Sequence, residues 1–180
     1  MQWPHYIFHR KREPNVWLGV ASGALAGLAG TIIMTQFQSA MSAMARPKPK
    51  PDEKEETGDN ATVKTAQALT KLATGHGIDN NSNKKMAGQI VHYSFGTAMG
   101  AVYGAMAEIQ PTSSSAMGLP FGAALWLAAD EVAVPSLGLS GPPTATPIRL
   151  HAYGLASHLI YGASTELCRK GFRRLLVGHV

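Results

Sequence analysis

Five ionisable residues lie within apolar sequence and could support proton or ion chemistry. They are His92, Asp130, Glu131, His151 and His158. Histidine exchanges protons near neutral pH, and a nearby carboxylate stabilises the charged ring. Ionisable groups at membrane depth are costly unless they are paired or hydrated, so they commonly mark functional sites. This set therefore predicts a polar cluster that handles protons or ions.

Each member of this cluster also has a structural explanation. Asp130 and Glu131 could end a helix at the lipid headgroups, just before Pro135. His92 and His158 could be neutral and buried, each donating a hydrogen bond to a carbonyl group. Two histidines on neighbouring helices could instead ligate a haem, but no companion motif supports that chemistry. We expect no catalytic residue, no metal site and no cofactor.

Two further acids are expected near the opposite side of the membrane. Glu166 has a partner in Lys170, one helical turn later. Glu108 could cap the end of a helix at the membrane interface. We therefore expect both glutamates to be interfacial.

The elements that must position these residues are membrane helices. Of the 27 charged residues, 16 basic and 11 acidic, 14 lie in 45–85, whereas 16–44 and 86–167 together hold only five. A water-soluble chain has no reason to sort its charges in this way, but a membrane protein must do so. The sequence therefore predicts an all-α fold, a polytopic membrane helical bundle.

Four apolar segments are the expected membrane spans of one membrane domain, 1–180. They are 16–41, 87–109, 116–139 and 151–167. About 20 helical residues cross a bilayer core, so the first two fit well. The third is interrupted by two acids, and the fourth is short but should continue as helix to about residue 176.

A hydrophilic insert, 45–86, separates the first two spans. Within it, apolar residues recur at helical spacing over about 61–74, which predicts a short amphipathic helix. Basic residues near both termini favour a four-span topology with both termini inside. The eight Lys and Arg of the insert would then lie outside, against the same rule. A rival topology has three true spans, because the third segment enters and leaves on one side.

Glycines recur at steps of four in all four segments. No hydrophobic force brings helices together in lipid, so small residues at this spacing let backbones approach and gain dispersion contacts. Glycine is also simply common in membrane helices. The expected packing positions are Gly23, Gly27, Gly96, Gly100, Gly104, Gly122, Gly154 and Gly162.

The second and fourth segments also resemble each other. Residues 93–108 align with 151–166 without gaps, and both contain the pattern Tyr-Gly-Ala-x-x-Glu. The first and third segments match more loosely, through paired glycines at 19 and 118 and at 23 and 122. This symmetry predicts a duplicated helical hairpin with the insert in its first copy.

Bulk composition excludes several classes of protein. The single Cys168 excludes an internal disulfide and any cysteine-rich metal site. The net charge of +5 comes largely from basic residues beside apolar runs, which favours a membrane surface and not nucleic acid. No nucleophile elbow, phosphate loop or zinc-protease helix is present, so we expect no enzymatic activity.

The order of several short motifs resembles the YagU-like family of bacterial inner-membrane proteins. These motifs are His92, Tyr103-Gly104, Ala107-Glu108, Pro111, Leu137 to Ser140, Pro142-Pro143, Pro147, His158-Leu159 and Glu166 before Arg169-Lys170. The resemblance covers the second half of the chain and implies a multi-pass protein of the inner membrane, with no known chemistry. The Pro/Lys-rich stretch after the first span and the pair Asp130-Glu131 depart from the family pattern.

Three functions follow, in descending order. The first is a small inner-membrane protein that acts as a structural or accessory component in contact with the lipid bilayer, as a homo-oligomer or with a membrane partner protein. The second is a proton- or ion-responsive carrier or acid-stress membrane protein that uses the polar cluster. The third is a haem- or metal-binding membrane module.

Overall fold

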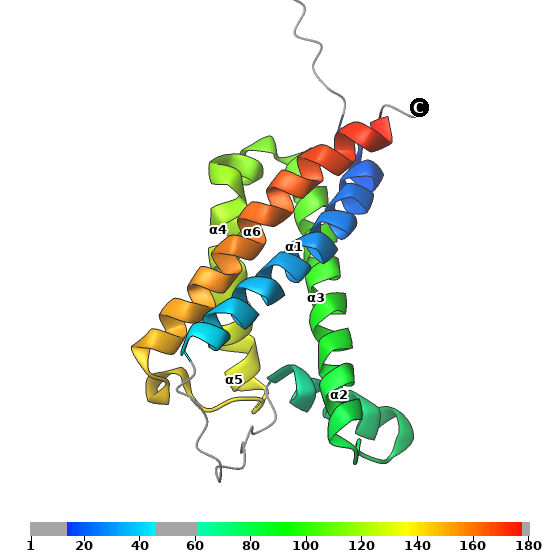
Figure 1. Ribbon diagram of the computed structural model, residues 1–180. Helices are drawn as coiled ribbons and strands as arrows, with labels where there is room; N and C mark the ends of the chain where they lie inside the picture. The colour runs from blue at the N-terminus through cyan, green and yellow to red at the C-terminus, as the bar shows by residue number, and fades with distance from the viewer. Residues whose placement is uncertain (1–13, 46–60, 178–180) are drawn as a thin grey trace, which may run out of the picture.

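The computed structural model describes residues 14–45 and 61–177, where all regular structure is helical (Figure 1). The longer helices are α1 (Val16–Ala45), α2 (Ala61–Thr74), α3 (Asn81–Ile109), α4 (Leu119–Trp126) and α6 (Ile148–Val177). The shorter ones are the 3₁₀ helices η1 (Pro111–Gly118) and η3 (Pro143–Ala145), the π-helix η2 (Leu127–Ala133) and α5 (Val134–Ser136). The predicted all-α class is confirmed.

Four long helical rods form the bundle. They are α1, α3, α6 and the continuous rod α4–η2–α5. α1 packs against both α3 and α6, the α4–η2–α5 rod packs on α6, and α2 packs on α3 (Figure 1). The start of α1 and the ends of α3 and α6 meet at what we call the terminal end. The loop 137–147 and α2 lie at the opposite, loop end.

Two helical stretches in the described chain are long and apolar enough to cross a membrane. They are Val16–Met44, which is nearly all of α1, and Pro111–Ser136, which contains η1 and the α4–η2–α5 rod. α3 and α6 lie alongside them but hold more polar and charged residues.

Large apolar side chains face outward from this bundle. Trp17 is 82% exposed, and Leu25 and Ile32 on α1 are 47% and 44% exposed. The buried apolar residues are Ala26, Met34, Val63, Ala66, Tyr103, Ala107 and Tyr161. The buried polar and charged residues are Ser22, Thr31, Glu108, Ser157, His158, Thr165, Glu166, Arg169 and Arg173. The described core therefore holds many polar and charged side chains, while many large apolar side chains face outward.

α1 and α3 touch through their glycines. A Cβ atom built on Gly27 would lie 2.7 Å from the Cα atom of Gly100, and one on Gly104 would lie 2.8 Å from the Cα atom of Gly23. Real Cβ atoms do not come this close to other atoms. The two backbones are therefore in direct contact, and a side chain at these positions would force the helices apart.

The rod α4–η2–α5 meets α6 in the same way. A Cβ atom on Gly162 would lie 3.1 Å from the Cα atom of Gly122, and one on Gly122 would lie 2.9 Å from the carbonyl carbon of His158. Closer to the loop end, a Cβ atom on Gly154 would lie 3.0 Å from the indole nitrogen of Trp126. Small residues thus set the spacing of this pair of helices as well.

Helix boundaries differ from the predicted segments where capping and backbone strain intervene. α3 begins at Asn81 and not near 87, because Asn80 caps it and accepts a hydrogen bond from the backbone N–H of Ser82 at 2.7 Å. The third segment, predicted as 116–139, is helical only from Leu119 to Ser136 in its α4–η2–α5 part. Positive φ angles at 116–118 and at Gly138 interrupt regular helix on both sides.

The π-helical turn in the third segment has a local cause. Pro135 has no N–H, and in a regular α-helix its ring would clash with the carbonyl group of Glu131, four residues earlier. The wider η2 turn directly precedes this proline. π-helical turns commonly occur at functional sites, and this one contains both acids of the expected polar cluster.

Candidate functional site

The expected polar cluster assembles in the loop-end half of the bundle. Asp130 and Glu131 come from η2, and His151 and His158 come from α6. The acidic side chains of η2 reach α6, where each lies beside one histidine. His92 on α3 completes the group, because it lies close enough to His158 for an electrostatic interaction.

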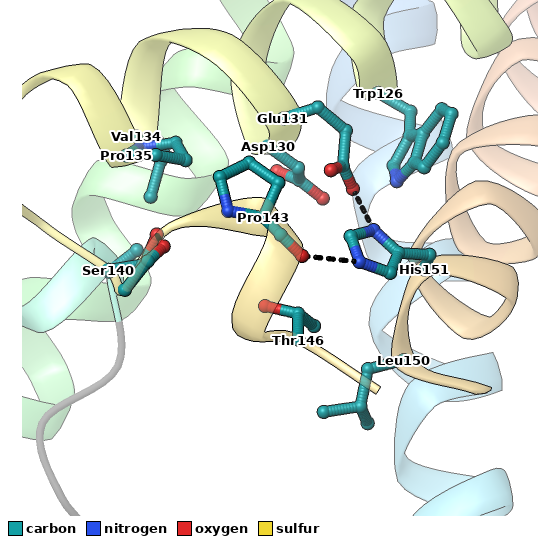
Figure 2. Close-up of a pocket in the computed structure, with 13 residues that line it drawn as sticks. Trp126, Asp130, Glu131, Val134, Pro135, Ser140, Pro143, Thr146, Leu150 and His151 are labelled. Atoms are coloured by element: carbon teal, nitrogen blue, oxygen red, sulfur yellow. Dashed lines mark hydrogen bonds and ion pairs between the residues drawn. The ribbon is translucent and has the colours of Figure 1, made fainter. Parts of the chain in front are cut away.

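His151 contacts two hydrogen-bond acceptors at once. Its Nδ1 atom lies 2.6 Å from Oε1 of Glu131, and its Nε2 atom lies 3.1 Å from the carbonyl oxygen of Pro143 (Figure 2). The side chains of His151 and Glu131 are 18% and 16% exposed. The imidazole ring therefore connects α6, η2 and the 137–147 loop.

His158 lies deeper in the bundle, and its contact with an acidic neighbour is longer. Its Nδ1 atom lies 3.0 Å from the carbonyl oxygen of Gly154, to which it donates, and 3.6 Å from Oδ2 of Asp130. The longer distance is an ion-pair contact and not a hydrogen bond. The side chain of Asp130 is 43% exposed, whereas that of His158 is 11% exposed. His158 thus makes the hydrogen bond to a carbonyl group that was expected from its sequence.

His92 differs from the other two histidines. Its Nε2 atom is buried and has no hydrogen-bond partner within the described ranges. Its ring packs edge-on against Tyr93, with 5.8 Å between the ring centroids. The expected carbonyl acceptor is therefore not found at this nitrogen.

A cleft opens beside the cluster at the loop end. It has a volume of about 290 Å³ and lies between η2, the 137–147 loop and α6. Polar groups of Asp130, Glu131, Ser140, Thr146 and His151 line it, together with Trp126 (Figure 2). A cleft of this size that contains several polar groups can hold water, so the acids and His151 can exchange protons with the outside of the bundle.

The two acids at the terminal end, which were expected near the membrane interface, are buried among the helices of the bundle. Glu166 is 1% exposed and contacts Lys170 at 3.2 Å, as its spacing indicated. It also accepts hydrogen bonds from Nε of Arg169 at 2.7 Å and from the hydroxyl group of Tyr103 at 3.0 Å. Arg169, three residues after Glu166, could have been predicted as a partner from the sequence, but Tyr103 could not, because it lies on another helix.

Glu108 has an equally unexpected set of partners. It pairs with Arg173 on α6 and accepts a hydrogen bond from the backbone N–H of Asn15 at 3.1 Å, just before α1. The expected capping role is therefore present, but it serves α1 and not the helix that contains Glu108. α6 continues past the expected span and covers this acid. No local sequence pattern links two residues 65 positions apart.

The surroundings of Arg169 at this end favour its charged form. Burial alone would lower the pKa of Arg169, but its hydrogen bond to Glu166 and the charge of that acid outweigh burial and raise the pKa. The guanidinium group also lies 5.9 Å from the ring centroid of Tyr103. These groups hold the helices together and are not suited to proton exchange near neutral pH.

Within residues 14–45 and 61–177, no three His, Cys, Asp or Glu side chains are grouped so that they could hold a metal ion. Residues 51–167 match a family described as "Protein of unknown function (DUF1440)", which is more than half of the chain. The chain belongs to the DUF1440 family. Neither the curated proteins nor the solved structures give a significant match.

The DUF1440 match contains the whole candidate site. It includes α2, α3, the chain from η1 to η3 and most of α6, and with them all five residues of the polar cluster and the lining of the cleft. α1 lies outside the DUF1440 match, although it packs against both α3 and α6. Arg169 and Arg173 also follow the matched region.

Proposed function

We propose that this DUF1440 protein is a multi-pass protein of the bacterial inner membrane, similar to the YagU-like family, with a structural or accessory role and no enzymatic activity. The sorting of its side chains supports this proposal most strongly. Leu25, Ile32 and Val102 face outward, whereas Glu108 and Glu166 are buried. Lipid is a good solvent for the first group and a poor one for the second.

The course of the third segment supports four crossings over three. At its start Gly118 lies against Gly162, and near its end Glu131 contacts His151. It therefore runs antiparallel to α6 along that helix from 162 back to 151, instead of returning to the side where it began. With four crossings the basic residues after Leu167 lie on the side of the N-terminus, in agreement with the positive-inside rule.

An accessory role fits the way in which the helices associate. Glycine contacts join α1 to α3 and α4 to α6, and small residues are the usual means of tight association in lipid. These contacts are used within one chain. The outward apolar residues are left for lipid, for a second copy of the chain or for a partner membrane protein.

Thiol labelling in intact cells tests the topology. Single cysteines would replace Ser82, Ser140 and Val177 in a Cys168→Ser background, and an impermeant maleimide would be added from outside. The proposal predicts labelling at 82 and 140 but not at 177, because the first two lie at the loop end and the third at the terminal end. Labelling at 140 with protection at 82 would support the three-span alternative instead.

A proton-responsive role is the second candidate, and the cleft favours it. Two histidine–carboxylate pairs, His151 with Glu131 and His158 with Asp130, lie on or next to the cleft. Histidine in such surroundings can change its charge in the physiological pH range. Purely structural polar residues in a membrane bundle have no need of a cavity.

Proton flux distinguishes this role from a purely structural one. The protein would be reconstituted in lipid vesicles that contain a pH-sensitive dye, as wild type, Asp130→Asn and His158→Ala. We expect proton uptake by wild type above that of empty vesicles and a reduction in both variants. If all three proteins match empty vesicles while they remain folded, the accessory role alone is supported.

A further inference from the structure

We infer that His151 and Glu131 form a proton-binding site whose occupancy latches the 137–147 loop to α6. The site belongs to the proton-responsive role proposed above, of which it specifies the regulation. It needs no proton transport, because the expected consequence is a local change of structure at the cleft. The two proposals can therefore fail separately.

The number of protons in the site follows from its hydrogen bonds. The carbonyl oxygen of Pro143 can only accept, so Nε2 of His151 must bear a proton to bond with it at 3.1 Å. An ionised Glu131 can also only accept, so Nδ1 must bear a proton as well at 2.6 Å. If instead the carboxyl group is protonated, it donates to Nδ1. In both cases the pair holds two protons, one more than a neutral imidazole beside a carboxylate.

Loss of that proton removes one of the two bonds. A neutral ring has a single N–H, which can bond to Glu131 or to Pro143 but not to both. The bond to the carboxylate is the shorter and is charge-assisted, so it should survive. Nε2 would then present a lone pair to the carbonyl oxygen of Pro143, and the two would repel. The latch is therefore closed at low pH and opens as the pH rises.

Few other charged groups surround this ring. η2 contributes Asp130 next to Glu131, α6 contributes Arg149 and His158, and the first turn of α2 contributes Lys64. The described part of α1 and the 137–147 loop have no titratable side chain. Asp130 contacts His158 on the next turns of α6, and Arg149 and Lys64 are exposed to solvent. Glu131 is thus the group that determines how firmly the proton is held.

The loop is built so that release of Pro143 has an effect. Pro143 begins the short helix η3, whose N–H groups bond only within the loop, from Ala145 to Pro142 and from Thr146 to Pro143. Near the start of the same loop, Gly138 has a φ of 71°, a conformation that favours glycine. Both Pro143 and Thr146 line the cleft. Movement of η3 away from His151 would therefore widen the cleft beside Asp130.

Hydrogen exchange of the full-length protein in lipid nanodiscs tests the latch at about pH 5 and about pH 9, on either side of the usual histidine range. After correction for the intrinsic pH dependence of exchange, wild type should show about tenfold faster exchange of the 137–147 peptide at the higher pH, the effect of losing one hydrogen bond. Peptides from α3 should not change, which shows that the fold is intact. An unchanged rate in wild type would overturn the latch, whatever the variants do.

Glu131→Gln is the sharpest variant. Its amide group can donate to Nδ1 of a neutral ring while Nε2–H still bonds to Pro143, so the loop should stay protected at both pH values. Asp79→Asn, at an exposed acid outside the polar cluster, is the matched control and should keep the wild-type response. His151→Leu should exchange fast at both pH values. If Glu131→Gln retains the wild-type change in exchange rate between the two pH values, the proton is bound elsewhere and the proposal is wrong. If wild type shows the pH-dependent change in hydrogen exchange but no proton flux in vesicles, the latch is supported and proton transport is rejected.

Discussion

The two halves of the bundle solve the same packing problem with different residues. The first hairpin consists of α1 and α3, and the second consists of the α4–η2–α5 rod and α6. Near the terminal end Gly19 lies against Gly104 in the first, as Gly118 lies against Gly162 in the second. The spacing of 58 residues that relates the tyrosine–glycine motifs of α3 and α6 therefore also relates their contacts, as expected of a duplicated hairpin.

Toward the loop end the hairpins diverge. Gly23 meets Gly100 in the first hairpin, but the corresponding Gly122 meets His158 in the second. Gly96 meets Thr31, whereas the corresponding Gly154 meets Trp126, and a Cβ atom built on Gly154 would lie 3.6 Å from Oδ2 of Asp130. The first hairpin stays closed by backbone contact, and the second contains a histidine, an acid and a cleft. Glycine-based helix packing can thus accommodate ionisable groups where a larger residue replaces a glycine, as His158 does at the position that corresponds to Gly100, and where a π-helical turn provides space.

The largest expected loss of stability comes from breaking the buried ion pair of Glu108 and Arg173 at the terminal end. Arg173→Ala would leave Glu108 buried without its cation and should lower the free energy of unfolding by about 3 kcal/mol. Arg174→Ala, at the exposed neighbouring position, should change it by less than about 0.5 kcal/mol. Chemical unfolding in detergent micelles measures both values. Equal stability of the two variants would mean that the ion pair is not buried in the membrane-embedded state.

The next test asks whether both hairpins depend on their glycines. Gly100→Leu and Gly162→Leu should each destabilise the bundle by about 2 to 3 kcal/mol, because the new side chain would overlap the facing backbone. Val102→Leu and Ile160→Leu, on the same helices but away from the glycine contacts, are the controls. Thermal unfolding in detergent provides the comparison. A tolerant Gly162 beside a sensitive Gly100 would show that only the first hairpin relies on backbone contact.

The smallest expected effect is the difference in stability between phenylalanine variants of Tyr103 and Tyr161, which occupy corresponding positions in α3 and α6. Tyr103 donates to the carboxylate of Glu166 at 3.0 Å, and Tyr161 donates to the carbonyl oxygen of Gly96 at 2.6 Å. Tyr103→Phe should cost about 1.5 to 3 kcal/mol and Tyr161→Phe about 1 kcal/mol, because hydrogen bonds to charged groups are the stronger. The same unfolding measurements apply. The reverse order would show that Glu166 is satisfied by its arginine and lysine alone.

Much of the architecture was accessible from local patterns. Segregated charge and glycine periodicity indicated long apolar helices, and the amphipathic pattern at 61–74 coincides with α2. The sequence grouped Asp130 and His158 in one polar cluster, and Nδ1 of His158 lies 3.6 Å from Oδ2 of Asp130. These features depend on helical repeat and chain length, which are local quantities.

Other features had no local signal. The contact of Glu131 with His151 could not be predicted over the alternative pairing with Asp130, because the π-helical turn changes which acid faces which histidine. The carbonyl partner of His151 comes from a proline in an irregular loop. Such contacts depend on backbone geometry that several residues determine together.

The sequence by itself determined that the chain is helical, that its charges avoid four long segments and that glycines line those segments, because each property follows from composition and the helical period. Only the tertiary structure decided how the ionisable residues are used. It placed Glu108 and Glu166 beneath arginines of an extended α6, and it joined His151 to both Glu131 and Pro143. The physical reason is that a buried charge is stabilised by whatever group the fold brings within about 3 Å, and that distance is unrelated to separation along the chain.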